Sequence, residues 1–138
     1  MNSPTSLTTI GILLLALVTV ESGGVFLTHV VRGRVPANAL QQSFFRAGHA
    51  HAAVLLVLSI AILTVIDNAQ LNGIWELIGR YGVPLAAIVM PAGFFLSVLG
   101  TDPAKPNKFL WLLWAGALSL TAGLLVSGIA LVVAGVNA

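Results

Sequence analysis

The amino-acid sequence predicts an all-α integral membrane protein, an antiparallel four-helix bundle that runs up-down-up-down through the bilayer. Hydrophobic residues make up 58% of the 138 positions and charged residues only 7%, whereas soluble domains carry about 25% charged residues. Four apolar stretches are each close to the roughly 20 residues that cross a bilayer as a helix. Short connections favour antiparallel neighbours, so residues 1–138 are expected to form a single four-span domain.

The first span is expected over residues 7–31. Its polar lead-in, residues 3–6, is typical of a helix start. No Lys or Arg precedes it, so it lacks the basic region of a signal peptide and is predicted to be a retained helix. After a turn that contains glycine and proline, Asn38 can cap a second span over residues 39–66.

A short amphipathic helix over residues 71–80 is expected to lie in the membrane interface, with Trp75 at the level of the lipid headgroups. The third span covers residues 83–99, and Pro91 near its middle predicts a kink. The fourth span covers residues 109–133 and follows a proline-rich turn.

Small residues recur at every third or fourth position of the fourth span: Gly116, Ser119, Gly123, Ser127, Ala130 and Ala134. Such a stripe lets helix backbones approach closely in lipid. It predicts close packing either within the protein or against another copy, and the sequence leaves both open.

Basic residues gather in two of the three connections. The connections between spans 1 and 2 and between spans 3 and 4 hold Arg32, Arg34, Lys105 and Lys108. The connection between spans 2 and 3 holds only Arg80, and the acids Asp67 and Glu76 near it are expected to be solvated. By the positive-inside rule the two basic connections are cytoplasmic, which places both termini outside.

Five ionisable residues lie within the first two spans: Glu21, His29, Arg46, His49 and His51. A charged side chain at the bilayer centre costs about 2.5–3.5 kcal/mol on translocon scales, so such residues usually face the bundle interior and mark a function. When spans 1 and 2 pair as a hairpin, Glu21 lies level with Ala50, and His29 lies nearer the cytoplasm. We therefore expect an interior polar site formed by Glu21, Arg46 and His49.

Helical phase separates the two histidines of the FFRAGHAHAA stretch. His49 and His51 stand about 200° apart around the helix axis, so they cannot bind one ion together. We expect His49 to face Glu21 and Arg46, and His51 to serve a second face.

Other roles for these side chains stay open. Glu21 and Arg46 could form a buried ion pair that fixes helix register. Arg46 could extend to the headgroups, His51 could face lipid or another protomer, and His29 could be solvated. Gly23 and Gly24 form a notch that admits either a ligand or another helix.

The segments ESGGVFLTH and FFRAGHAHAAVLL resemble a family of small four-span bacterial membrane proteins, which carry a GGVF-like stretch late in span 1 and an HxH near the start of span 2. More distantly, the HxH resembles the helix of haem–copper oxidase catalytic subunits in which alternate histidines ligate two haems. It is also similar to histidine-rich haem and copper membrane proteins associated with nitric oxide stress. The resemblance implies ligation by His49 and His51 and a location in the bacterial inner membrane. Four spans instead of twelve, and no copper-site histidine set, argue against oxygen reduction.

The leading hypothesis is a membrane protein that binds haem b or a transition metal ion. His49 or His51 would be the metal ligand, Arg46 would pair a propionate, and Glu21 and His29 are further candidate cofactor contacts. His29 is about 10 Å too shallow to oppose His49. Ligation would therefore be one-sided, or shared across a homodimer or a higher homo-oligomer.

Two other hypotheses are a small proton-coupled transporter, with Glu21 as the protonation site and His49 as a relay, and an accessory or assembly subunit of a larger membrane complex. Catalysis is not expected, because no catalytic triad or phosphate-binding loop is apparent and a Glu/His/His zinc set fails on spacing. The chain has no cysteine, which excludes disulfides and thiolate ligands. The net charge of +2 gives no indication of nucleic-acid binding, and the expected partners are the lipid bilayer and further copies of the chain.

Overall fold

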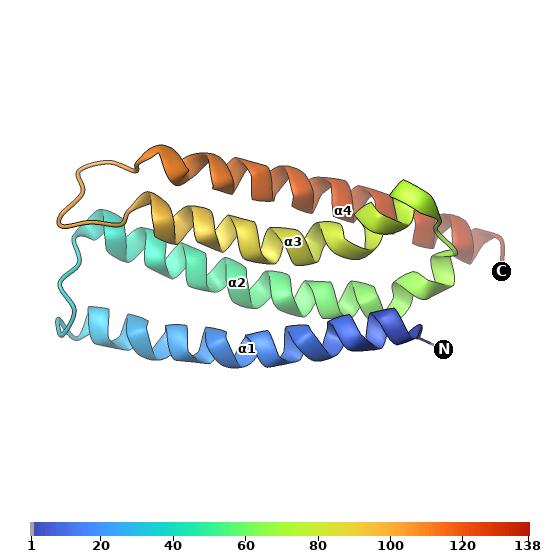
Figure 1. The fold of residues 1–138 in the computed structure, drawn as a ribbon, viewed down its shortest axis with the longest axis horizontal. Helices are drawn as coiled ribbons and strands as arrows, with labels where there is room; N and C mark the ends of the chain where they lie inside the picture. Colours follow the sequence, from blue (N-terminus) through green and yellow to red (C-terminus); the bar gives the residue numbers. More distant parts are fainter. Residues whose placement is uncertain (1) are drawn as a thin grey trace.

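The computed structural model describes residues 2–138 and confirms the predicted all-α four-helix architecture. Four long helices run antiparallel, and both termini lie at the same end of the molecule (Figure 1). We call this the terminal end, and it also holds the connection between the second and third helices. The opposite end, the loop end, holds the connections over residues 32–38 and 98–107.

Helix α1 spans Pro4–Val31. The Ser3 hydroxyl caps its start by accepting a hydrogen bond from the Ser6 backbone N–H at 3.1 Å. Pro4 sits in the first turn, where a missing N–H removes no helical hydrogen bond. The helix ends just before Gly33, whose φ of +69° is a left-handed conformation that suits glycine. It begins about one turn earlier than predicted and ends at the predicted residue.

Helix α2 spans Ala39–Val65 and begins at the predicted cap. Asn38 and Gln41 form a capping box in which each side chain accepts from the other residue's backbone N–H. The Gln41 side-chain amide also donates to the carbonyl oxygens of Val98 and Gly100, at 3.1 and 3.0 Å, which ties the last connection to α2. A single 3₁₀ turn, η1, follows over Ile66–Ala69.

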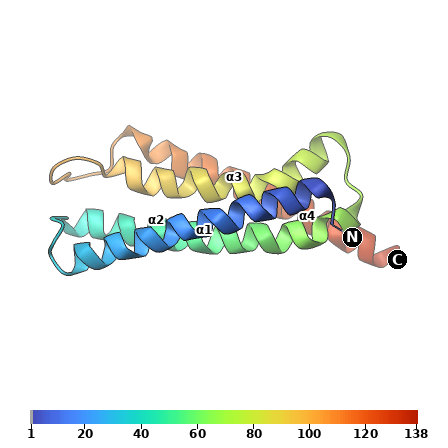
Figure 2. The same cartoon turned by 60° about the horizontal axis from the view of Figure 1, so that its bottom comes forward.

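Helix α3 spans Gly73–Ser97 without interruption, so the separate interfacial helix predicted over residues 71–80 is instead the start of this span. Figure 2 shows these first turns tilted away from the rest of α3. Pro84 has no N–H to give to the carbonyl one turn earlier, which predicts a bend rather than a break. The helix continues through Pro91 as well, which is buried.

Serine hydroxyls of the fourth helix satisfy backbone carbonyls in the tilted part of α3. Ser119 Oγ donates to the Gly82 carbonyl at 2.8 Å, and Ser127 Oγ donates to the Gly79 carbonyl at 2.9 Å. These two hydrogen bonds join α4 to the part of α3 that was predicted to be a separate helix. Pro84 frees the Arg80 carbonyl, and neither serine donates to that carbonyl.

Helix α4 spans Trp111–Val136 and follows a short 3₁₀ turn, η2, over Lys108–Leu110. Its stripe of small residues faces α3. A Cβ added at Gly93 of α3 would lie 2.5 Å from the Leu113 nitrogen, and one added at Gly82 would lie 2.7 Å from the Gly123 Cα. Of the two roles left open for the stripe, packing within the protein is the one that the structure shows.

The helices pack in chain order: α1 contacts α2, α2 contacts α3, and α3 contacts α4 (Figures 1 and 2). The central helices are α2 and α3, because 33% and 56% of their most apolar stretches are buried, compared with 6% for α1 and 11% for α4. The largest hydrophobic core lies along this central pair: Leu55, Leu56, Ile62, Leu63, Ile66, Val83, Ala86, Ala87 and Met90, with Leu13 from α1.

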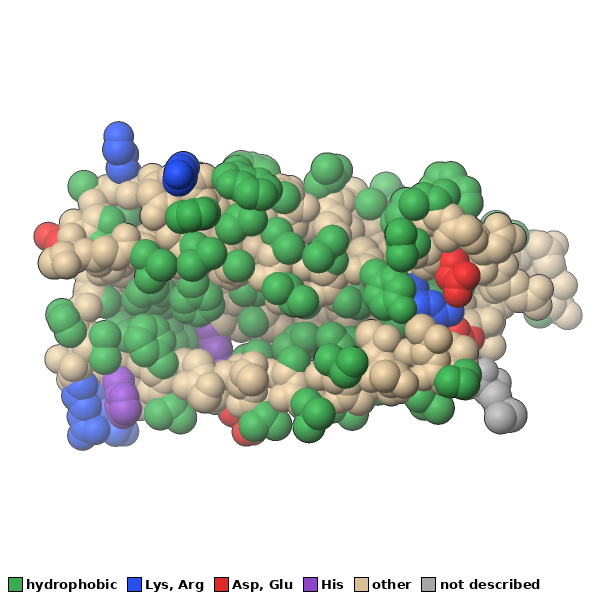
Figure 3. All heavy atoms as spheres, viewed as in Figure 1, with side chains coloured by type: hydrophobic (Ala, Val, Ile, Leu, Met, Phe, Trp, Pro, Cys, Tyr) green, Lys and Arg blue, Asp and Glu red, His purple; other side chains and the backbone are tan. Residues whose placement is uncertain are grey.

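All four helices are long and apolar enough to cross a membrane, so the protein is a multi-pass membrane protein. Apolar side chains (green) cover most of the visible length in Figure 3, whereas charged side chains gather mainly at the two ends. Acidic atoms (red) and a histidine (purple) are also visible between the ends.

Candidate functional site

A hollow of about 430 Å³ opens between α1 and α2 near the middle of their length. The predicted pair Glu21 and His49 both line it, together with Leu17, Val18, Val20, Gly24 and Ala53. The other lining residues are apolar or small. Glu21 and His49 are thus the only titratable residues among those that line the hollow. The hairpin prediction thus places Glu21 and His49 beside one hollow, but Arg46, the third residue of the expected site, does not line it.

His49 inserts into the notch formed by Gly23 and Gly24 on α1. A Cβ at Gly23 would lie 3.2 Å from Nδ1 of His49, and a Cβ at Gly24 would lie 3.7 Å from Nε2. The nitrogen-bearing edge of the imidazole thus faces the α1 backbone. The notch, predicted to admit a ligand or another helix, is occupied by a side chain of the same protein.

Glu21 is exposed on the surface of α1, midway along the helix, so the prediction that it faces the bundle interior is wrong. The expected ion pair with Arg46 is not formed among the described residues, where both ion pairs involve Arg80. Arg46 is itself exposed, and its Nε donates to the Gln42 carbonyl at 3.1 Å, one turn nearer the loop end. Arg46 thus lies outside the hollow, because its long side chain extends along its own helix.

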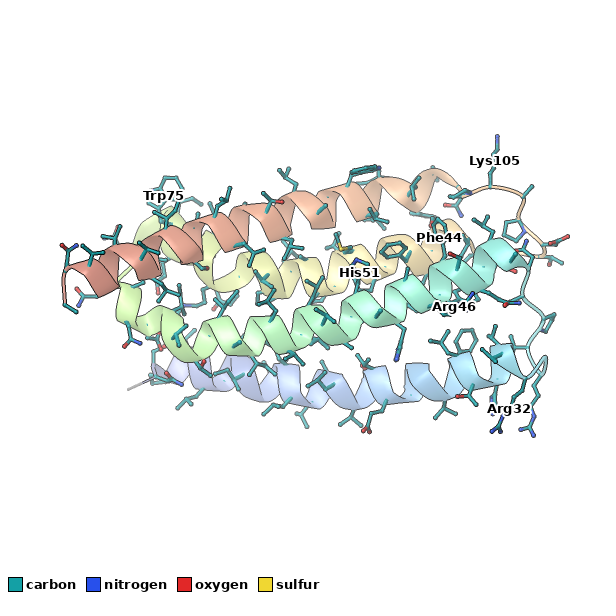
Figure 4. All side chains as sticks on the ribbon, turned by 180° about the vertical axis from the view of Figure 1, so that it is seen from behind. Arg32, Phe44, Arg46, His51, Trp75 and Lys105 are labelled. Atoms are coloured by element: carbon teal, nitrogen blue, oxygen red, sulfur yellow. The ribbon has the colours of Figure 1, made fainter. Side chains whose placement is uncertain are left out.

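His51 lies on the opposite side of α2 from His49, as helical phase predicts. Figure 4 shows it between α2 and α3, in the same space as Phe44. Its ring centroid is 4.9 Å from that of Phe94. Nδ1 of His51 is 2.7 Å from the Ala47 carbonyl oxygen. Because a carbonyl only accepts, Nδ1 carries the proton, and in the neutral ring Nε2 keeps a lone pair.

His29 lies near the loop end and is half-buried. It is about 9 Å along α1 from Gly23, where His49 packs, so His29 and His49 do not converge. In residues 2–138 no three side chains among His, Asp and Glu come together closely enough to hold a metal ion.

A second polar centre, around Arg80, was not predicted. Arg80 is 7% exposed and forms ion pairs with Asp67 at 2.8 Å and with Glu76 at 3.3 Å. It also donates to the Ser6 hydroxyl, and the Ser3 backbone N–H donates to Asp67 at 2.6 Å. This Arg80 centre joins the start of α1 to the end of α2 and to α3.

The prediction that Asp67 is solvated is wrong, since its side chain is only 13% exposed, whereas that of Glu76 is 48% exposed. The spacing of Glu76 and Arg80, one helical turn apart, was an available signal for an ion pair. The partnership with Asp67 and Ser6 depends on how the helix ends meet in space, and no sequence spacing indicates it.

No protein-family model, curated protein or solved structure matches this chain. The resemblance to small four-span bacterial membrane proteins therefore stays a prediction.

Proposed function

We propose that the protein is a small membrane transporter that exchanges protons for a cationic substrate at Glu21. The observation that supports this proposal is the hollow between α1 and α2, in which Glu21 and His49 are the only titratable lining residues. A charged carboxylate is unfavourable inside a bilayer. It is neutralised either by a proton or by a bound cation, so binding of one displaces the other.

His49 is the proposed proton relay in this cycle. Its ring nitrogens lie along the Gly23–Gly24 notch, which begins two residues after Glu21 in the chain, so the two titratable groups share one small region. Neutral imidazole both donates and accepts a hydrogen bond. It can therefore receive the proton that Glu21 releases when a cation arrives.

The rest of the fold is suited to hold this site. The α3–α4 pair is packed backbone to backbone through its glycines, while only 6% of the most apolar stretch of α1 is buried. Movement of α1 against α2 would therefore disturb little of the core. In the proposed cycle, this movement exposes Glu21 to one side of the membrane and then to the other.

The test uses protein reconstituted in vesicles, with the lipophilic cation tetraphenylphosphonium as the probe and a pH dye as the readout. Addition of the cation should release protons, and Glu21→Gln should abolish this release. Glu76→Gln is the matched control and should leave it unchanged, because Glu76 lies at the terminal end in the Arg80 centre. Proton release that persists in Glu21→Gln, or is absent from the wild type with a panel of organic cations, would reject the proposal.

A second candidate function is binding of haem b or a transition metal ion, and the state of His51 favours it. An axial histidine normally donates its other ring N–H to a carbonyl or a carboxylate, and Nδ1 of His51 lies 2.7 Å from the Ala47 carbonyl oxygen. The free Nε2 is then the ligand atom, and Arg46 would pair a propionate. Purified protein supplemented with haem should show a Soret band that His51→Ala removes, and a colourless wild-type preparation would reject this candidate.

The proposal also includes the membrane in which the protein lies, its orientation and its state of association. We place the protein in the bacterial inner membrane, with both termini outside and the connections holding Arg32 and Lys105 in the cytoplasm. We also propose a homodimer or higher homo-oligomer, or association with a larger membrane complex as an accessory subunit. Since the chain has no cysteine, single cysteines introduced at the two ends report orientation by their accessibility to an impermeant thiol reagent.

A further inference from the structure

A larger cavity of about 810 Å³ lies at the terminal end, away from the hollow that holds Glu21. One wall comes from the connection between η1 and α3, and the other comes from the last turns of α4. Figure 4 shows Trp75 at this end of the molecule, beside α4. Neither the proposed transport cycle nor the haem alternative uses this cavity.

The walls of the cavity divide into an apolar part and an amide part. Ile129 and Val133 of α4 and the ring of Trp75 supply the apolar part, and Asn68, Gln70 and Asn137 supply the amides. No Lys, Arg, His, Asp or Glu is among the residues that line it. Arg80, which is close in sequence to Trp75, is already engaged by Asp67 and Glu76.

The amides are available for a ligand. In residues 2–138 the side chains of Asn68 and Gln70 make no hydrogen bond to the protein, while Asn137 donates one, to the Val133 carbonyl at 2.9 Å. An amide side chain offers both a donor and an acceptor. Gln70 also has a φ of 49°, a left-handed backbone conformation that is uncommon outside glycine.

From this arrangement we infer that the cavity binds an uncharged amphiphilic lipid of the diacylglycerol type. Its hydroxyl and ester groups would meet the amides at the end of the bundle, and an acyl chain would lie along the apolar wall of α4. The part of α4 from Val126 to Val136 provides about 15 Å of length for that chain. A phospholipid headgroup would find no cation among the lining residues for its phosphate, so the site selects neutral lipids.

Small residues on α4 leave the space that the lipid occupies. Ala130 and Ala134 line the cavity, whereas Gly128 does not, and a Cβ at Gly128 would meet nothing within 4 Å. Leucine at either alanine would therefore fill part of the cavity. Leucine at Gly128 would leave it open, which gives a matched control on the same helix.

The experiment measures quenching of Trp75 fluorescence by brominated lipids in nanodiscs. The chain has three tryptophans, and replacing Trp111 and Trp114 by phenylalanine leaves Trp75 as the only tryptophan, which is excited selectively at the red edge of the absorption band. Brominated diacylglycerol should quench it with a saturable dependence on mole fraction. Brominated phosphatidylglycerol and phosphatidylcholine should give only weaker, non-saturating quenching from the surrounding bilayer.

Ala130→Leu and Ala134→Leu should each remove the saturable component of the quenching, whereas Gly128→Leu should keep this component. Gln70→Ala should shift the saturation to a higher mole fraction of brominated diacylglycerol. Circular dichroism and gel filtration verify that each variant is folded, and two cavity-filling variants guard against the failure of one. Equal quenching by diacylglycerol and the phospholipids would overturn the inference. Saturable quenching that persists in a folded cavity-filling variant would also overturn it.

Discussion

Glycine has opposite roles in two helix–helix interfaces, the one between α3 and α4 and the one between α1 and α2. Between α3 and α4, glycines let backbones touch, as at Gly93, where an added Cβ would lie 2.5 Å from the Leu113 nitrogen. Between α1 and α2, Gly23 and Gly24 instead leave a slot for the imidazole of His49. The number of glycines in an interface therefore does not distinguish close helix packing from a candidate functional site. The distinction comes from the group that occupies the space beside each glycine, which is either helix backbone or a side chain.

The interface between α1 and α2 also holds the hollow that is lined by the exposed carboxylate of Glu21. α1 is held at the terminal end by the Arg80 centre, which contacts Ser3 and Ser6, and at the loop end by Val30, which packs in a cluster with Phe45. A rigid α3–α4 pair beside a lightly packed α1 is the arrangement that the proposed function requires. The predictions below test this contrast, from the largest expected effect to the smallest.

Arg80→Met should cause the largest loss of stability. It leaves Asp67, whose side chain is 13% exposed, without its cation, and removing one partner of a buried ion pair costs about 3–5 kcal/mol. The measurement is thermal unfolding in detergent, followed by circular dichroism. The double variant Arg80→Met with Asp67→Asn should recover much of the loss, and a double variant as unstable as the single one would contradict the ion-pair account.

Gly93→Ala and Gly82→Ala should each destabilise the protein by about 1–3 kcal/mol, because the added methyl groups would overlap the backbone of α4. The helices must separate to accommodate them. Gly128→Ala on α4 is the control and should not destabilise the protein, since nothing lies within 4 Å of its Cβ position. Equal stability of all three variants in the same unfolding assay would show that α3 and α4 are not in close contact.

Gly23→Ala and Gly24→Ala should have a neutral or stabilising effect, in contrast to the α3–α4 substitutions. Their Cβ atoms would lie 3.2 and 3.7 Å from His49 ring nitrogens, and a flexible side chain can move by that small amount. Alanine favours a helix over glycine by about 0.5–1 kcal/mol. A loss as large as that of Gly93→Ala would mean that the α1–α2 interface is as tightly packed as the α3–α4 interface.

Glu21→Gln should change the free energy of unfolding by no more than about 0.5 kcal/mol, because Glu21 is exposed and has no ion pair among the described residues. Its effect should appear in proton release instead. Equilibrium unfolding and the proton-release assay, carried out on the same preparation, separate an effect on stability from an effect on proton release. A strongly destabilised Glu21→Gln variant would indicate a structural role for the carboxylate.

Much of the fold could be predicted from the sequence, because hydropathy and length define membrane spans well. The position of Glu21 and His49 beside one hollow was also predictable, since a hairpin with a short connection fixes which residues share a depth. The opposite directions of His49 and His51 follow from the helical period alone. These are local or nearly local properties of the chain.

The remaining features depend on contacts between distant segments. The burial of Arg80 arises because the end of α2, the start of α1 and the tilted part of α3 meet, and Ser6 is 74 positions away from it. The carbonyls of Gly82 and Gly79 in α3 accept hydrogen bonds from hydroxyls of α4 that lie 37 and 48 positions away, and no local pattern indicates these contacts. The position of Arg46 outside the hollow reflects the freedom of a long side chain, which helical phase does not define.

Carbodiimide labelling tests most directly whether Glu21 is a titratable carboxyl open to the membrane interior. Dicyclohexylcarbodiimide is apolar and reacts with protonated carboxyls from the lipid phase, and mass spectrometry locates the adduct. We predict an adduct at Glu21 that tetraphenylphosphonium slows, with Asp67 unmodified because it is paired with Arg80. An unmodified Glu21 under conditions that label Glu76, or labelling that the cation does not slow, would contradict the account.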